Sequence, residues 1–303
     1  MLKGCDVSLW EGRGIDWEAA KAAGLGWVSV KVSEGRTITD PCAVHNVAGA
    51  LAAGLPVMPY HYLLPSSSAE AQWERFHASI EACGGWDGLL APALDVEGDD
   101  HNSLPNMSGQ DYANLARNWL ALMEAETKQK GVVYTYPSFN SENGIGGVLG
   151  AHSYLWAASY GDHAPVFAGW DHCSFWQYTS SGSFPGIPND NGLDLDWFLG
   201  SADDLASLLV VKPKELKVVL PDGTVCACEP RWVGERITVK AEPLLAALGL
   251  PQNNPAVHVG TGRAFVGAPD GLADNCPGWE FVYRSPAQGP RVYCKRVKGA
   301  VRA

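Results

Sequence analysis

GLLAPALDVEG, residues 88–98, is the segment of the sequence that says most about the fold. It is apolar as far as Leu94 and then carries Asp95 and Glu97, a pattern that predicts a buried strand with two carboxyl groups at its end. Side chains alternate between the faces of a strand, so residues two apart point the same way. The two carboxyl groups are therefore predicted to share one face.

Two acids at the end of a buried strand disfavour each other's ionisation, which costs stability. Such a pair is therefore expected where it serves a function. Paired carboxyl groups carry out glycoside hydrolysis, where one donates a proton and the other attacks or stabilises charge. The ordinary interpretation is a pair of strand-end acids that face water, because a D-x-E motif is short. The other strands decide between these interpretations.

Short apolar runs alternate with amphipathic stretches through the first part of the chain. The candidate strands are KGCDVSLW (3–10), GWVSVKVSEG (26–35), GLPVMPYHYL (54–63), GLLAPALDVEG (88–98), GVVYTYPS (131–138), SYLWAASYG (153–161), CSFWQYTS (173–180) and GLDLDWF (192–198). Helices are predicted at 17–24, 40–53, 69–83 and 108–130, and little room for helices remains from about residue 141 onward. The pattern favours the α/β class, as an irregular (β/α) TIM-like barrel of parallel strands with a helix-poor second half.

Acidic and aromatic residues gather at the carboxyl ends of these runs. They are Asp6, Trp10, Glu34, Tyr60, Tyr62, Asp95, Glu97, Tyr134, Tyr136, Trp156, Tyr160, Trp176, Gln177, Tyr178, Asp194 and Asp196. The carboxyl ends of the strands form the active-site rim of such barrels. Aromatic faces stack on sugar rings and acids bind hydroxyl groups, so the rim favours a saccharide cleft, although some of the aromatic residues are expected in the barrel core.

Composition and charge limit the kinds of molecule that the protein is expected to bind. The chain has 303 residues, of which 46% are hydrophobic and 18% charged, as in soluble globular proteins, and no apolar run reaches about 18 residues, so no membrane contact is expected. The net charge of −11 divides into −16 for residues 1–210 and +5 for residues 211–303. A negative first part disfavours nucleic acid as a partner, whereas a basic second part suits either an anionic polymer or plain solvation.

Several motifs of the chain, among them GCDVSLWEGRGIDWEAAKAAG, WVSVKVSEG, ALDVE and FWQYTSSGSFPGI, occur in the same order in a known family. Through them residues 1–209 resemble the family 25 glycoside hydrolases, the Chalaropsis-type lysozymes or N-acetylmuramidases. The resemblance implies cleavage of the β-1,4 bond between N-acetylmuramic acid and N-acetylglucosamine in peptidoglycan, without a metal or cofactor. Many relatives are phage endolysins. The N-terminus MLKGCDVSLWEG lacks the apolar region of a signal peptide, so we expect a protein made in the cytoplasm that reaches the cell wall through a phage holin or another export route.

The resemblance also assigns site residues. Glu97 corresponds to the catalytic acid/base, Asp95 to its partner, and Asp6 and Asp194 to two further acids of the cleft. The expected substrate-binding residues are Tyr60, Tyr62, Tyr134, Trp156, Tyr160, Gln177 and Asp196. Asp196 replaces an Asn common in relatives, and its extra charge is expected to raise a neighbour's pKa. Whether Asp95 attacks the sugar or orients its 2-acetamido group stays open, with the second route favoured; both retain configuration.

Two alternatives use the same barrel. A chitinase-like β-N-acetylglucosaminidase would have a further Asp two residues before Asp95, and Ala93 occupies that position. A catalytically silent glycan-binding barrel is expected to have lost at least one of the four acids, and all four are present.

Residues 210–216 are interpreted as a linker and residues 217–303 as a small α+β domain. It has hairpin strands around Pro221-Asp222-Gly223 and a helix near 241–248, and it weakly resembles the copper amine oxidase N-terminal-like (stalk) domain. Its basic charge suggests binding to an anionic wall polymer; a spacer or dimerisation domain is the alternative. Of the eight cysteines, Cys5, Cys42, Cys83 and Cys173 are expected as buried thiols, while Cys226, Cys228, Cys276 and Cys294 suit bridges better than zinc.

Overall fold

The computed structural model describes residues 1–98, 104, 106–188 and 192–210 in full, and beyond them the backbone of strands between residues 216 and 296. The chain divides into two compact units, Met1–Val211 and Lys212–Ala303. All of the predicted site residues belong to the first unit.

Eight strands of the first unit close into a barrel. They are β1 (Leu2–Val7), β2 (Trp27–Glu34), β4 (Val57–Tyr62), β5 (Ala93–Asp95), β6 (Gly131–Thr135), β7 (Ser153–Ala158), β8 (Phe175–Gly182) and β9 (Leu193–Phe198). Their order is β1-β9-β8-β7-β6-β5-β4-β2, and β1 pairs with β2 to complete the ring; the short β3 (Ile38–Thr39) folds back on β2. The predicted barrel and its eight strand positions are confirmed.

The last strand departs from the prediction of a parallel barrel. β9 runs antiparallel to both of its neighbours, β1 and β8. β8 ends at Gly182 and β9 begins at Leu193, and this connection is too short for the crossover that a parallel strand requires. The start of β9 therefore lies at the rim where the parallel strands end, and Asp194 is paired with Asp6 of β1.

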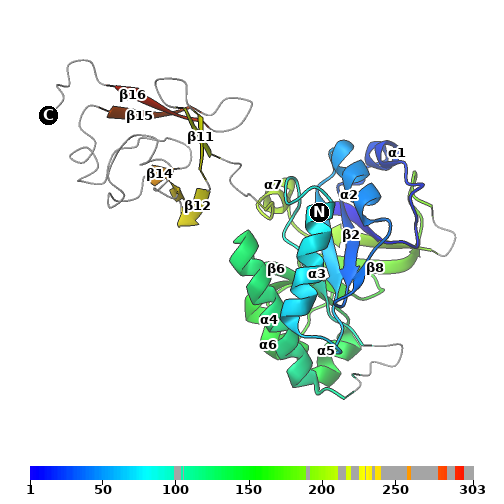
Figure 1. Ribbon diagram of the computed structural model, residues 1–303. Coiled ribbons are helices and arrows are strands. Elements are labelled where there is room, and N and C mark those ends of the chain that lie inside the picture. Colours follow the sequence, from blue (N-terminus) through cyan, green and yellow to red (C-terminus); the bar gives the residue numbers. More distant parts are fainter. Residues whose placement is uncertain are drawn as a thin grey trace. The chain divides into compact units, whose positions relative to one another are not determined.

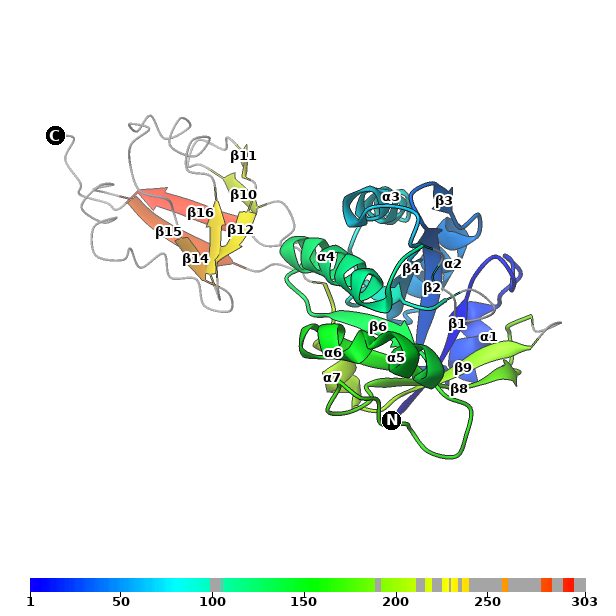
Figure 2. The ribbon, with the colours of Figure 1, turned by 90° about the horizontal axis from the view of Figure 1, so that it is seen from below.

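The predicted helices lie outside the barrel (Figure 1, Figure 2). They are α1 (Trp17–Ala22), α2 (Ala43–Ala52), α3 (Ala69–Ala82) and α4 (Gly109–Thr127). Three of them begin after a side chain that accepts a hydrogen bond from the first helical turn, namely Asp16, Ser68 and Ser108. Such caps satisfy N–H groups that have no partner inside the helix, which explains why these helices begin where they do.

The second half of the barrel is poor in helices, as predicted, but it does contain short ones. They are α5 (Pro137–Asn143), α6 (Ile145–Leu149), the 3-10 turn η1 (Gly150–His152) and α7 (Ala202–Ala206). α5 and α6 form the connection between β6 and β7, and their shortness kept them below the length at which helical periodicity shows in a sequence.

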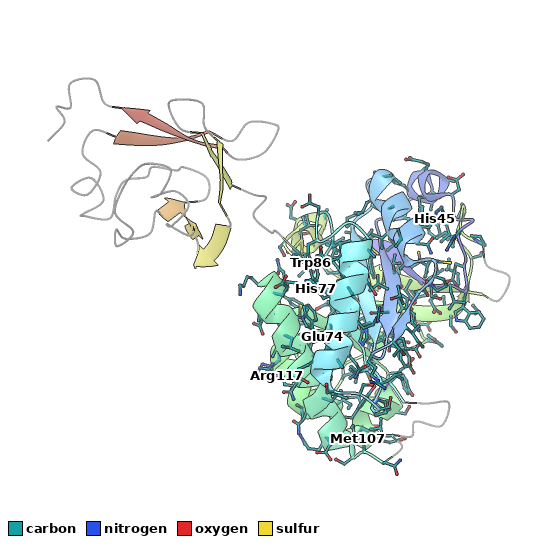
Figure 3. The ribbon with its side chains drawn as sticks, in the orientation of Figure 1. His45, Glu74, His77, Trp86, Met107 and Arg117 are labelled. Atoms are coloured by element: carbon teal, nitrogen blue, oxygen red, sulfur yellow. The ribbon has the colours of Figure 1, made fainter. Side chains whose placement is uncertain are left out.

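An aromatic layer joins α3 and α4 to the outer face of β4. The ring of Trp119 on α4 lies 5.1 Å from that of Phe76 on α3, and it stacks on the imidazole of His61 on β4 at 5.6 Å. At the outer surface His77 of α3 lies 3.6 Å from Glu126 of α4 (Figure 3). The layer fixes β4, and with it the side chains that β4 presents on its inner face.

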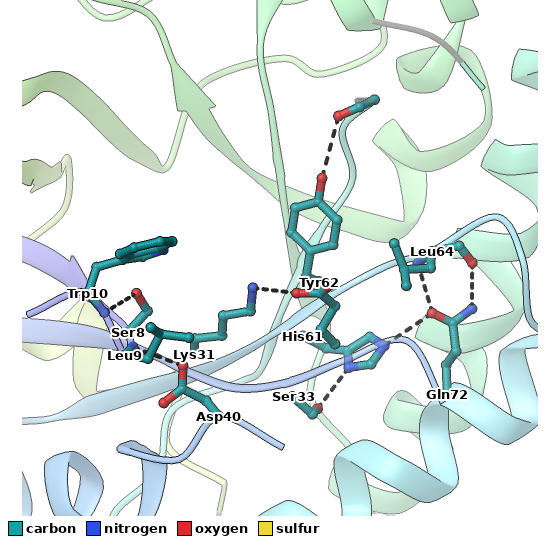
Figure 4. Close-up of polar contacts among 12 residues, drawn as sticks. Ser8, Leu9, Trp10, Lys31, Ser33, Asp40, His61, Tyr62, Leu64 and Gln72 are labelled. Atoms are coloured by element: carbon teal, nitrogen blue, oxygen red, sulfur yellow. Dashed lines mark hydrogen bonds and ion pairs between the residues drawn. The ribbon is translucent and has the colours of Figure 1, made fainter. Parts of the chain in front are cut away.

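His61 also anchors the loop that follows β4 (Figure 4). Its Nδ1 lies 2.8 Å from Ser33 Oγ and its Nε2 3.4 Å from Gln72 Oε1. Gln72 accepts a hydrogen bond from the Leu64 backbone N–H at 2.8 Å and donates to the carbonyl oxygens of Leu64 and Ser67. Burial lowers the pKa of His61 to about 3, so the imidazole is neutral and packs as part of the core.

Replacing Gln72 with Leu is expected to lower the free energy of unfolding by about 3 kcal/mol, because buried backbone groups of the loop lose their partners. Urea unfolding of the full chain, followed by tryptophan fluorescence, measures the change. Gln110→Leu is the matched control, since Gln110 is exposed on α4. Equal stability of the two variants would contradict the anchoring role of Gln72.

The described strands of the second unit form two small sheets. One has the order β11-β10-β16-β15 and the other β12-β13-β14. The strands are β10 (Leu216–Val219), β11 (Val225–Cys228), β12 (Pro230–Val233), β13 (Arg236–Val239), β14 (His258–Gly260), β15 (Trp279–Arg284) and β16 (Arg291–Arg296). β10 and β11 pair antiparallel, as the predicted hairpin requires. The predicted helix near 241–248 and the side chains of the last four cysteines lie outside the described residues.

Candidate active site

A cavity of about 260 Å³ opens at the rim of the barrel and brings most of the predicted site residues together. Its lining consists of Asp6, Val7, Ser8, Trp10, Glu11, Lys31, Tyr60, Tyr62, Asp95, Glu97, Tyr134, Trp156, Gln177 and Asp194. Nine of the eleven predicted residues are in this set. The other two, Tyr160 and Asp196, do not line the cavity.

The end of β5 sets the positions of Asp95 and Glu97. The carbonyl oxygen of Tyr134 accepts a hydrogen bond from the Val96 backbone N–H at 2.9 Å, and that of Asp95 accepts one from the Leu63 N–H at 3.0 Å. Val96 is fully buried on the opposite side, so the two acids share the cavity, as the alternation of a strand predicts. Just beyond the strand, the carbonyl oxygen of Glu97 accepts a hydrogen bond from the hydroxyl group of Tyr112 on α4 at 3.2 Å.

Burial controls the charge of this pair. It raises the pKa of Glu97 to about 7; the positive charge of Lys31 opposes the rise and the negative charge of Asp194 adds to it. Burial also raises the pKa of Asp95 well above its usual range, and the charge of Glu97 raises it further. Two close carboxyl groups cannot easily both be ionised, so the pair holds a proton near neutral pH.

Lys31 is a site residue that the sequence reasoning missed. It lies on β2, pairs with Glu34 at 2.8 Å, and places its ammonium group 4.9 Å from the ring centre of Tyr62 (Figure 4). Its charge lowers the pKa of both Asp95 and Glu97. A lysine inside an otherwise apolar strand was the available signal, because a charged group at such a position needs a partner.

Asp6 and Asp194 form a second acidic group on the opposite side of the cavity. They are paired across β1 and β9, and Gln177 donates a hydrogen bond from Nε2 to Asp6 Oδ2 at 2.9 Å. Burial raises the pKa of Asp194 to about 6, and it raises the pKa of Asp6 as well, with further increases from Asp194 and Asp196. The cavity therefore has acids on two sides.

Asp196 lies below the cavity, although the sequence placed it among the substrate-binding residues. It is fully buried, and its Oδ1 accepts a hydrogen bond from Trp156 Nε1 at 2.7 Å. Because β9 runs antiparallel to its neighbours, its chain leads away from the rim. Asp196, two residues after Asp194, therefore lies deeper in the barrel. Burial raises the pKa of Asp196 to about 8, and its carboxyl group holds the indole of Trp156.

Aromatic rings form one wall of the cavity. The ring of Trp156 lies 4.9 Å from that of Tyr134 and 6.2 Å from that of Tyr60, in edge-to-face arrangements. Tyr160 is 60% exposed and donates a hydrogen bond to Gln177 Oε1 at 3.1 Å, so it reaches the site through Gln177. These rings offer both a packing surface and hydroxyl groups to a ligand.

Within the fully described residues the thiols of Cys5, Cys42 and Cys173 are buried and that of Cys83 is half-buried, and all four are free. The same residues contain no cluster of His, Cys, Asp and Glu arranged to hold a metal ion. None of the helices described is long and apolar enough to cross a membrane.

Comparison with protein families matches residues 5–187 to the family described as glycosyl hydrolases family 25. Lysozyme M1 of Streptomyces globisporus is 32% identical over 216 residues, which are 68% of this chain and 71% of that protein. The N,O-diacetylmuramidase of Chalaropsis is 27% identical, over 68% of this chain and 98% of that protein. The match ends before the second unit, so it does not support the stalk-domain resemblance.

Solved structures show the same similarity. The bacterial lysozyme from Streptomyces coelicolor superposes with a TM-score of 0.62 and 31% identity, over 69% of this chain and 96% of that one. A muramidase from Trichobolus zukalii gives a TM-score of 0.61 and 26% identity, over 69% of this chain and 99% of the other.

Proposed function

The chain belongs to glycosyl hydrolase family 25 and is a peptidoglycan hydrolase of the muramidase class, and from this premise we propose how the residues of its cavity act. Glu97 is the general acid/base, Asp95 is its partner, and Asp6 and Asp194 complete the acidic cleft. The bond cleaved is the β-1,4 bond between N-acetylmuramic acid and N-acetylglucosamine.

The position of Glu97 in the cavity, together with its raised pKa, carries this proposal. A general acid must hold its proton near the working pH, and the pKa of Glu97 is about 7. Glu97 is also half-buried at the end of β5, whereas Asp95 is 7% exposed below it. The pair shares one proton near neutral pH, and we place it on Glu97 because Glu97 is the more exposed of the two and can reach the leaving oxygen. Glu97 donates this proton and later accepts one from water, while Asp95 carries the negative charge, which the charge of Lys31 favours.

Asp95 orients the 2-acetamido group of the substrate in this proposal. Its Oδ1 is buried and has no hydrogen-bond partner among the described residues. A buried acceptor without a partner is costly, and the amide N–H of an acetamido group would satisfy it. The acetamido oxygen then attacks the anomeric carbon, and configuration is retained. Direct attack by Asp95, with the same stereochemical outcome, is the competing route.

The remaining predicted residues bind the substrate. Tyr60, Tyr62, Tyr134 and Trp156 give the sugar an aromatic wall, and Gln177 links Tyr134 and Tyr160 to Asp6. Burial raises the pKa of Tyr60, Tyr62 and Tyr134, so their hydroxyl groups stay neutral donors. Asp196 acts on the substrate through Trp156.

Mass spectrometry of fragments released from purified peptidoglycan tests the bond that is cleaved. We expect fragments with muramic acid at the reducing end. Glucosamine at the reducing end, or faster cleavage of chitin oligomers than of peptidoglycan, would favour the chitinase-like alternative instead. Intact peptidoglycan would indicate a silent glycan-binding barrel.

Substitution of Lys31 by Met is expected to move the pH–rate profile toward higher pH. Lys31 lowers the pKa of both carboxyl groups, so its loss raises both. The high-pH limb requires protonated Glu97 and the low-pH limb requires ionised Asp95, so both limbs move in the same direction. Lys31→Arg, which keeps the charge, is the control. A profile that is unchanged or moves to lower pH would refute this role.

The second unit, we propose further, binds an anionic polymer of the cell wall. Its net charge of +5 supports this, beside a first part that is strongly negative. The full-length Glu97→Gln variant should bind purified walls more tightly than the same variant ending at Val211, and added salt or removal of anionic polymers should abolish the difference. Equal binding would leave a spacer role. Release by a holin or another export route stays a prediction.

A further inference from the structure

Trp10 is an exposed aromatic residue that the proposed mechanism does not use. Its side chain is 77% exposed, yet it lines the cavity together with Asp6 and Glu11. The sequence marked it as an aromatic residue at a strand end without placing it among the substrate-binding residues. A single exposed apolar residue is ordinary on a protein surface, so its significance depends on how it is held.

The turn that carries Trp10 is fixed to its surroundings (Figure 4). The backbone N–H of Trp10 donates to Ser8 Oγ at 3.2 Å, and that of Ser8 donates to Glu11 Oε2 at 2.8 Å. Asp40, beyond β2, accepts a hydrogen bond from the Leu9 backbone at 2.9 Å. The end of the turn is held by α2, where the buried Asn46 donates a hydrogen bond from Nδ2 to the carbonyl oxygen of Gly12 at 3.1 Å.

These contacts fix the backbone that carries the indole, so the turn needs little reorganisation when a ligand binds. Binding usually costs side-chain and loop entropy, and a turn already held by four hydrogen bonds avoids much of that cost. The side chain of Trp10 stays open to water. An exposed indole on a fixed turn suits a flat, partly apolar ligand, and the apolar face of a pyranose ring is such a ligand.

Trp10 and the catalytic pair lie on different sides of the cavity. Trp10 follows β1, whose neighbours in the barrel are β2 and β9, while Asp95 and Glu97 follow β5, whose neighbours are β4 and β6. A sugar on the indole is therefore displaced from the bond being cleaved. Glu11 and Asp6 line the cavity on the same side as Trp10.

We propose that the exposed face of Trp10 binds a pyranose ring of the glycan strand in a subsite removed from the cleavage point. This deepens the proposed function and rests on it. The subsite gives the enzyme a preference for long glycan strands, because only a strand that spans the cavity reaches both Glu97 and Trp10.

Steady-state kinetics of the full chain on soluble peptidoglycan oligomers of increasing length test the subsite. Trp10→Ala should raise KM for long oligomers by roughly 3- to 10-fold, leave kcat and the KM for the shortest cleaved oligomer unchanged, and leave the thermal midpoint unchanged. Trp10→Phe keeps an aromatic face and should restore most of the KM. Val166→Ala is the control, because Val166 is 82% exposed and does not line the cavity.

Several results would overturn the subsite: an unchanged KM for long oligomers, an equal rise for every length, the same loss in Trp10→Phe, or a lower thermal midpoint. The experiments distinguish an error in the proposed subsite from an error in the catalytic role of Glu97. An active Glu97→Gln variant would remove the assignment of the acid without affecting the length dependence, whereas a length-independent Trp10→Ala variant would leave the assignment of Glu97 intact.

Discussion

Glu97→Gln is expected to lower kcat for cell-wall lysis by about 1,000-fold or more, as loss of a general acid does. The amide keeps the shape of the side chain but has no proton of suitable acidity to give to the leaving oxygen. Binding should persist, because the aromatic wall and the second acidic group are unchanged. Turbidity of a cell-wall suspension measures lysis, and sedimentation with walls measures binding.

The control for this variant is Glu74→Gln, since Glu74 is exposed on α3 (Figure 3). Glu97→Gln should also be at least as stable as the parent protein, because burial and the charge of Asp194 oppose ionisation of Glu97 in the folded state. Substantial lysis by a folded Glu97→Gln variant would exclude Glu97 as the acid. Loss of lysis together with loss of stability would point to misfolding instead.

Asp95→Asn is expected to lower kcat by about 100-fold or more, because both routes need the negative charge that Asp95 carries beside the reacting sugar. The substitution keeps the size of the side chain but replaces a charged acceptor with a neutral amide. Asp162→Asn, at an exposed position away from the cavity, is the control. Turbidity of a cell-wall suspension measures both variants. Activity close to that of the parent protein would show that Asp95 has neither role.

A change of substrate separates the two routes open to Asp95. If Asp95 orients the acetamido group, the parent enzyme should fail on peptidoglycan whose muramic acid lacks its N-acetyl group. No covalent intermediate should then be detected by mass spectrometry of the quenched enzyme. If Asp95 is the nucleophile, cleavage should continue and a glycosyl adduct on Asp95 should be trapped. The partnerless Oδ1 of Asp95 leads us to expect the first result.

Much of the barrel could be predicted because its signals are local. The apolar runs located all eight strands, and the amphipathic stretches between them located the long helices, which the structure shows to begin after the caps Ser68 and Ser108. The alternation of a strand was enough to place Asp95 and Glu97 in one cavity. Helices α5 and α6 were missed, since a helix of one or two turns leaves too few residues for a periodic pattern.

What the sequence determined by itself was therefore the family, the barrel and the four acids, because motif order and side-chain periodicity depend on residues near one another in the chain. The tertiary structure alone decided that β9 is reversed, that Asp196 lies below the cavity, and that Lys31 faces the acidic pair. It also decided the raised pKa of Glu97, because a pKa depends on which groups the closed barrel brings together and how much water it excludes.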